Sequence, residues 1–420
     1  MSDLFAFNGN MPGGVLNNYL SRALTHCAIG FTNKQKSPCF EDDLRMFKNM
    51  GAKYIGRAAS IWSTGFADDD FFYYMCEKMA ARAHEGDPEL LLQACVFEAV
   101  RKQSVDVIPV PAYVFAAFGA RAEKRCFRYD DMIFTDGRYV NHWGPDCSVP
   151  DITRIETRMF FYYRASRYIK AGYEGIHYGQ VVLIGKNDFD FRNWTEVIQM
   201  TRAYAAQHAR RRYVVIDAHL LGDLRKLGPE LFDFNAFPIR LKEIVEKPME
   251  CICEEGYLDS MFTPEHGFCK PFLVEFDNFG ISSAPGVANL KNHYAWGYDE
   301  ITWYAIQNAE YRHQFLRYIT DWVNSRYPEG WVQYPSRRVI KQAVEFIWKD
   351  PNEAWLRDAK TWEGCEYEIL PDGAARLPRL YYSANNLSEA CPFGFGDEDA
   401  IGAMIGRQAA AAAKGGKYEL

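Results

Sequence analysis

Residues 90–98 read Leu-Leu-Leu-Gln-Ala-Cys-Val-Phe-Glu, a nearly continuous apolar run that ends in a carboxylate. Such a run fits a strand of a parallel sheet that is covered on both faces. Before and after this run, other short apolar runs alternate with longer amphipathic stretches, which is the pattern of βα units. Eight runs can be counted along the chain. The sequence therefore predicts an α/β protein, a (β/α)8 TIM barrel with long loop insertions and a C-terminal extension.

The expected elements can be given by residue range. The expected strands are 26–31, 53–58, 90–98, 173–184, 213–220, either 237–241 or 249–253, 272–277 and 331–334. The expected helices are 41–50, 70–84, 152–171, 194–210, 298–326 and 339–348, with a long excursion over 100–149. We expect an N-terminal loop segment over 1–24, the barrel over 25–350 and an extension packed on it over 351–420. An open doubly wound sheet is the alternative, but no Gly-x-Gly-x-x-Gly follows any of the strands.

Composition limits the partners of this 420-residue chain. A net charge of −7 argues against a nucleic-acid partner, and no apolar stretch is long enough for a membrane span. The 11 cysteines have no regular spacing, and no secretory signal is visible, so we expect reduced thiols in a cytoplasmic protein. An aromatic content of 15% suits sugar binding, because a pyranose stacks its C–H face on a ring. We expect a small carbohydrate substrate and no cofactor, and assembly into a homo-oligomer is left open.

Candidate catalytic groups lie where the strands end, because barrel enzymes build their active sites there. Glu98 ends the third run, where loss of water would raise its pKa and suit a general acid or base. The alternative is an outward Glu that begins a helix. Asp217 and His219 alternate onto one face of the fifth strand, as Glu275 and Asp277 do on the seventh. Two carboxylates on one face are costly to bury without partners, which favours a functional role.

Polar and aromatic residues near these strand ends are the candidate substrate-binding groups. They are Arg57, Trp62, His177, Gln180, His219, Asn278, Trp296, Asp299 and Glu300. Arg57 would bind carboxylates or an anionic substrate, and Trp296 would stack on a sugar. Gln180 cannot titrate and would only bind. His177 is equally well explained by a place in the core, and Asp299 by a cap on the following helix.

Over roughly residues 25–340 the chain resembles the superfamily of (β/α)8-barrel glycoside hydrolases, without a specific family being identified. The resemblance lies in the acids at the strand ends and the tryptophan nearby: Glu98, Asp217, Glu275, Asp277 and Trp296. It implies cleavage of a glycosidic bond by two carboxylates, one acid and one nucleophile or base. Many such enzymes carry Asn-Glu at the fourth strand, where this chain has Gln180. The resemblance then implies Glu98 as the acid and Glu275 or Asp277 as its partner.

Two other functions remain open at this point. A sugar isomerase, epimerase or lyase that depends on a divalent metal could use Glu98, Asp217, His219 and Glu275 as oxygen-rich mixed ligands. A non-catalytic carbohydrate-binding barrel is the third hypothesis, because the fourth-strand glutamate is missing.

Overall fold

The barrel expected from the sequence is present. A computed structural model describes residues 3–32, 35–37, 39–62, 69–220, 231–258, 260, 262, 271–348, 368–391 and 393–414. Eight strands follow one another around the sheet: β1 (Ala23–His26), β4 (Tyr54–Ile61), β5 (Leu91–Val96), β8 (Gly175–His177), β9 (Val215–Ala218), β10 (Phe234–Pro238), β13 (Phe272–Glu275) and β14 (Gly330–Trp348). Because β1 pairs in parallel with both β4 and β14, this order closes into a TIM barrel.

Helices and short strand pairs complete the described fold. The helices are α1 (Gly13–Leu20), α2 (Phe40–Met50), α3 (Asp69–Gly86), α4 (Lys102–Val105), α5 (Ala112–Ala117), α6 (Ile155–Lys170), α7 (Val181–Ile184), α8 (Arg192–His208), α10 (Glu300–Ile306), α11 (Ala309–Arg326) and α13 (Glu398–Ala413), with a 3-10 turn at Tyr129–Asp131. The two-stranded sheets pair β2 (Phe31–Thr32) with β3 (Gln35–Lys36), β6 (Val100–Arg101) with β7 (Cys147–Ser148), and β11 (Lys242–Glu243) with β12 (Cys251–Ile252). Of the helices described, none has the length and apolar character needed to cross a membrane.

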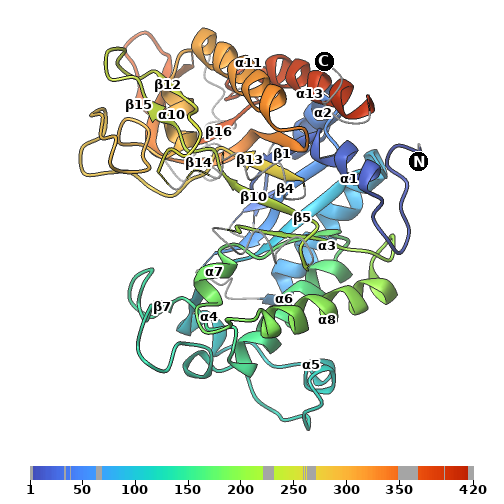
Figure 1. Ribbon diagram of the computed structural model, residues 1–420. Coiled ribbons are helices and arrows are strands. Elements are labelled where there is room, and N and C mark those ends of the chain that lie inside the picture. The colour runs from blue at the N-terminus through green and yellow to red at the C-terminus, as the bar shows by residue number, and fades with distance from the viewer. Residues whose placement is uncertain are drawn as a thin grey trace. The chain divides into compact units, whose positions relative to one another are not determined.

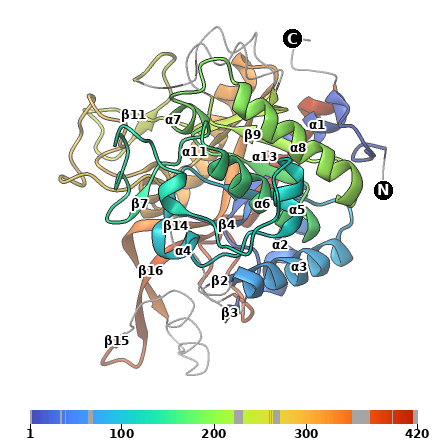
Figure 2. The same ribbon diagram turned by 90° about the horizontal axis from the view of Figure 1, so that it is seen from below.

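The chain divides into two compact units. The first unit comprises Met1–Leu16 and Arg57–Ala236, and the second comprises Asn17–Gly56 and Phe237–Leu420. Within the first unit, α6 packs against α3, α5 and α8 and against strand β5 (Figure 2). Within the second, α13 packs against α2 and α11, so the C-terminal helix belongs to that unit (Figure 1).

Several predicted elements are confirmed with shifted ends. The helix expected over 41–50 is α2, and Gly51 ends it in the left-handed conformation at φ 70°. The strand expected over 26–31 ends at His26 instead, because Ala28 and Gly30 adopt positive φ values of 58° and 73° that a strand cannot accommodate. For the sixth strand, β10 overlaps the first of the two alternatives, whereas β12 belongs to a separate two-stranded sheet.

Two helix predictions are wrong. Residues 339–348 were expected to be helical but continue strand β14, which pairs antiparallel with β16 (Ala375–Ser383), followed in the sheet by β15 (Glu368–Ile369) (Figure 2). That pairing partner is distant in sequence, so the local pattern did not reveal it. The single helix expected over 298–326 is two helices. The second begins where the Asn308 side chain accepts a hydrogen bond from the Tyr311 N–H.

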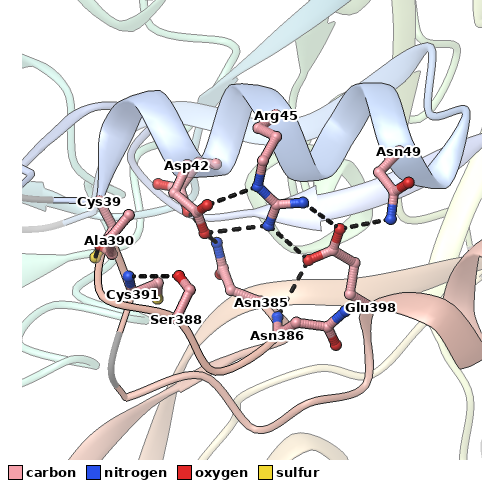
Figure 3. A network of polar contacts seen from close by, with 11 residues as sticks. Cys39, Asp42, Arg45, Asn49, Asn385, Asn386, Ser388, Ala390, Cys391 and Glu398 are labelled. Atoms are coloured by element: carbon pink, nitrogen blue, oxygen red, sulfur yellow. Dashed lines mark hydrogen bonds and ion pairs between the residues drawn. The ribbon is translucent and has the colours of Figure 1, made fainter.

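A polar network in the second unit joins α2 to the start of α13 (Figure 3). Arg45 donates from Nε to Asp42 Oδ1 at 2.7 Å and from two Nη atoms to Glu398 at 2.7 and 2.8 Å. Asn49 also donates to Glu398, and Asn385 donates to Asp42. Because both carboxylates are buried, the network satisfies charges that would otherwise be costly.

We expect Arg45→Met to lower the free energy of unfolding by about 2 kcal/mol, because it leaves two buried carboxylates with only amide partners. Half of the Arg45 side chain is exposed, which keeps the loss below that of a fully buried pair. Urea denaturation measures the change. Arg407→Met is the control, since the bridge from Arg407 to Asp321 is exposed on both sides and is worth less than about 1 kcal/mol. Equal losses in both variants would contradict the role given to the network.

Candidate active site

Glu98, two residues beyond β5 in the first unit, has its carboxylate held on both oxygens. Trp62 Nε1 and Gln180 Nε2 lie 3.4 and 3.3 Å from Oε1, and the Gln180 backbone N–H lies 3.4 Å from Oε2. The side chain is buried, so Glu98 is not an outward residue at a helix start. The three hydrogen bonds are long, and a substrate hydroxyl could therefore compete for the same oxygens.

Gly179 makes room for this carboxylate. Its φ is 60°, and a Cβ added there would overlap Glu98 Oε2. We expect Gly179→Ala to displace the Glu98 carboxylate and to weaken substrate binding about tenfold, the equivalent of about 1.4 kcal/mol. Left-handed backbone costs a further 1–2 kcal/mol or so of stability in any non-glycine residue. Gly137→Ala controls for that cost, since φ there is 80° and no atom lies within 4 Å of the added Cβ. Titration with substrate measures the loss of binding, and thermal melting measures the loss of stability. Equal binding by the Gly179→Ala and Gly137→Ala variants would contradict the prediction.

His177 and Asp217 form a buried pair in the same unit. The two residues are register partners on β8 and β9, and His177 Nδ1 lies 2.7 Å from Asp217 Oδ2. Gln93 on β5 donates to Asp217 Oδ1 at 2.6 Å and accepts from the Arg57 backbone N–H at 2.9 Å. His177 Nε2 is buried and has no hydrogen-bond partner among the described residues. The His219 ring lies 4.9 Å from the His177 ring.

Sequence reasoning missed Gln93, although one signal was visible. It is the only polar residue before the terminal glutamate of the run 90–98, and a polar side chain inside such a run requires a buried partner. The partner could not be identified, because Asp217 is 124 positions away along the chain.

The seventh-strand acids lie in the second unit and share an arginine. Arg338 on β14 donates to Asp277 Oδ1 at 2.7 Å and lies 3.9 Å from Glu275 Oε2, which also faces the Thr25 hydroxyl at 3.5 Å. The Asp277 side chain is 18% exposed and that of Glu275 only 2%. Asp277 is therefore the more exposed of the two acids and makes the closer contact with Arg338.

Two further carboxyl groups begin α10. Asp299 caps the helix, as its alternative interpretation expected, by accepting from the Thr302 N–H at 2.8 Å; burial raises the pKa of Asp299 to about 6. Glu300 is fully buried, and Arg240 Nη1 donates to its Oε1 at 3.0 Å. Its Oε2 has no hydrogen-bond partner among the described residues. Burial, opposed by Arg240 and reinforced by the charge of Asp277, raises the pKa of Glu300 to about 8.

Three of the expected binding residues make contacts of a structural kind. The Arg57 guanidinium lies 5.3 Å above the centre of the Phe97 ring. Asn278 Nδ2 donates to the Val339 carbonyl oxygen at 2.6 Å. Trp296 was expected to stack on a sugar, but its ring is only 5% exposed and its Nε1 donates to the Glu250 carbonyl oxygen. The buried indole does not offer the open face that stacking requires.

Metal binding gains no support from the described side chains. Among the residues with a described position, no three His, Cys, Asp or Glu side chains lie close enough to hold a metal ion. Of the four ligands expected for the metal-dependent alternative, Glu98, Asp217 and His219 belong to the first unit and Glu275 to the second.

The chain has a distant likeness in fold to several solved structures. A family 27 β-L-arabinopyranosidase from Geobacillus stearothermophilus is 13% identical over 53% of this chain, with a TM-score of 0.32, and the chain spans about half of its length (54%). A debranching enzyme from Nostoc punctiforme is 9% identical over 94% of this chain and 80% of its own, with a TM-score of 0.44. An α-amylase from Geobacillus thermoleovorans complexed with acarbose is 10% identical over 76% of this chain and 70% of its own, with a TM-score of 0.41. No family model and no curated protein matches the chain. None of the chemistry below rests on these similarities.

Proposed function

We propose that the chain hydrolyses a glycosidic bond, with Asp277 as nucleophile or base and Glu300 as general acid. One observation carries this assignment: burial, against the opposing charge of Arg240, raises the pKa of Glu300 to about 8, so this carboxyl group can hold a proton at neutral pH. Asp277, the second carboxyl group, forms an ion pair with Arg338. The Ile301 N–H, next to Glu300, donates to the Asp277 carbonyl oxygen at 3.2 Å. A protonated carboxyl group together with a second carboxylate supplies the acid and the nucleophile or base that glycoside hydrolysis needs.

The reaction needs a proton for the leaving oxygen and an electron pair for the anomeric carbon. The Glu300 carboxyl gives its proton to the leaving oxygen as the glycosidic C–O bond breaks. The Asp277 carboxylate attacks the anomeric carbon, and water then cleaves the resulting glycosyl ester; alternatively, the carboxylate takes a proton from the water that attacks the anomeric carbon directly. Arg338 fixes the Asp277 carboxylate, and Glu275 in turn lies beside Arg338. This assignment replaces Glu98 by Glu300 as the acid.

Glu98 and Gln180 form a separate polar cluster in the first unit, which we assign to the binding of a polar ligand. Glu98 accepts hydrogen bonds on both oxygens, which suits an acceptor of sugar hydroxyl protons. In the same unit Asp217 fixes the His177 ring through Nδ1, and His177 Nε2 is buried without a hydrogen-bond partner among the described residues. A cluster of fixed polar groups of this kind orients a polar ligand.

A panel of p-nitrophenyl glycosides, varied in sugar and anomeric configuration, tests the proposal. We expect release of p-nitrophenol from at least one member, with the same rate before and after treatment with EDTA. Activity on free sugars that returns only with added Mg²⁺ or Mn²⁺ would instead support the isomerase, epimerase or lyase alternative. Sugar binding without release over long incubation would support a non-catalytic barrel.

A further inference from the structure

Two cysteines of the second unit meet where the segment between β16 and α13 packs on the start of α2. Cys39 directly precedes α2, and Cys391 lies in that segment. The Cys39 thiol donates to the carbonyl oxygen of Ala390, the residue before Cys391, at 3.3 Å (Figure 3). It also hydrogen-bonds with the Cys391 thiol. Both side chains are buried and form a small cluster with Phe393, so the thiols are neighbours although the residues lie near opposite ends of the sequence.

Hydrogen bonds around the pair hold the two segments in this arrangement. The Asn385 amide donates to Asp42 Oδ2 at 2.8 Å and to Asp43 Oδ1 at 3.1 Å, which attaches the segment to the first turn of α2. The Cys391 N–H donates to Ser388 Oγ at 3.0 Å. These three bonds use no sulfur atom, so joining the sulfurs would leave them intact. A disulfide requires Cα atoms within about 7 Å and side chains that point toward each other, which thiols that share a hydrogen bond nearly satisfy.

The two thiols differ in how an oxidant would react with them. The hydrogen bond with Cys391, together with burial, raises the pKa of the Cys39 thiol, which disfavours the thiolate that attacks an oxidant. Cys391, although buried itself, directly follows the exposed residues 387–390. A local movement of this exposed run would uncover Cys391 while α2 stays in place. Cys391 is therefore the thiol that we expect to react first.

We propose that Cys39 and Cys391 are a redox pair whose oxidation joins the start of α2 to the segment before α13 through a disulfide. The oxidant is a small disulfide such as oxidised glutathione. The Cys391 thiolate attacks one of its sulfurs, which forms a mixed disulfide and releases one glutathione thiolate. The Cys39 thiolate then attacks the Cys391 sulfur and releases the second. Two protein thiols are thus oxidised, one glutathione disulfide is reduced, and the two glutathione thiolates take the protons that the cysteines have lost.

The test uses the full-length chain, which is first reduced and then incubated with oxidised glutathione. Peptide mapping by mass spectrometry, without further reduction, identifies the linked residues. We expect a peptide pair that joins Cys39 to Cys391. A link between distant parts of the sequence restricts the unfolded chain, so the oxidised chain should melt a few degrees higher, and dithiothreitol should reverse the shift.

Cys39→Ser and Cys391→Ser should each abolish both the linked peptide and the rise in melting temperature. In Cys39→Ser, glutathione should stay attached to Cys391, because the second attack cannot occur. Cys126→Ser is the matched control, since Cys126 is a half-buried cysteine of the first unit and its loss should leave the disulfide unaffected. A wild-type chain whose Cys39 and Cys391 stay unlinked in oxidised glutathione would overturn the proposal, whether or not the variants fold. An equal rise in melting temperature in wild type, Cys39→Ser and Cys391→Ser would overturn it as well.

Discussion

Asp277→Asn is expected to lower kcat/KM for the best aryl glycoside by about 10³- to 10⁵-fold, while the chain stays folded. The amide keeps the shape of the side chain but cannot attack the anomeric carbon or accept a proton from water. Asp277 is the more exposed of the two seventh-strand acids, with 18% of its side chain exposed against 2% for Glu275, and it makes the closer contact with Arg338. Steady-state rates together with a thermal melt measure both consequences.

Glu275→Gln separates the two acids of this strand. Glu275 lies 3.9 Å from Arg338 without making its close ion pair, so its amide should slow the reaction far less than Asp277→Asn does. Asp321→Asn, on an exposed residue of α11, controls for the loss of one carboxylate and should have wild-type rates. A larger loss in Glu275→Gln than in Asp277→Asn would transfer the catalytic role to Glu275. Full activity in both would remove β13 from the mechanism.

Chemical rescue distinguishes a catalytic Asp277 from a residue that only positions Arg338. In Asp277→Gly the missing carboxylate leaves space beside the anomeric carbon, and added azide can attack there in its place. We expect turnover of an activated aryl glycoside to recover with rising azide concentration and to yield a glycosyl azide. An inactive variant that stays folded but shows no rescue by azide or formate would contradict the assigned role.

The sequence was sufficient for the barrel because its strands are local, apolar and clearly bounded. The run 90–98 and the equivalent runs before Asp217 and Asp277 each correspond to a strand of the ring. The helix prediction over 339–348 failed because these residues of β14 pair with β16, a strand that lies elsewhere in the chain. A pattern within ten residues cannot show a partner that lies elsewhere in the chain.

The features of the candidate site were likewise predictable only where the sequence signal is local. The acids that end apolar runs could be identified, whereas the raised pKa of Glu300 could not. It comes from full burial and from the charge of Asp277, which together outweigh the opposing charge of Arg240, and Arg240 is 60 positions away. Similarly, nothing local predicts that Trp143 turns its indole N–H toward the Glu98 carbonyl oxygen. Trp296, by contrast, was expected to stack on a sugar because two acids lie near it in sequence, but the fold buries it.

Glu300→Gln should remove the general acid and, with it, the alkaline limit of the reaction. Because only protonated Glu300 can donate, wild-type kcat/KM should be level below a pH of about 8 and fall about tenfold per unit above it. The variant should lose about 10²- to 10⁴-fold on alkyl glycosides, whose leaving oxygen needs a proton. On a 2,4-dinitrophenyl glycoside, whose leaving group departs unprotonated, it should lose little and show no fall near pH 8.

Stability gives a second and independent measure of the same proton. Burial raises the pKa of Glu300 in the folded chain to about 8, above the usual 4.5 of a glutamate, so its contribution to stability is fully present below pH 4.5 and is lost as pH rises through 8. Wild-type melting temperature should therefore fall more between pH 6 and pH 9 than that of Glu300→Gln, whose amide does not titrate. Parallel melting curves would show that Glu300 is ionised at neutral pH and cannot be the acid. A changed melting profile combined with equal losses on alkyl and dinitrophenyl glycosides would make Glu300 a structural group without a role in proton transfer.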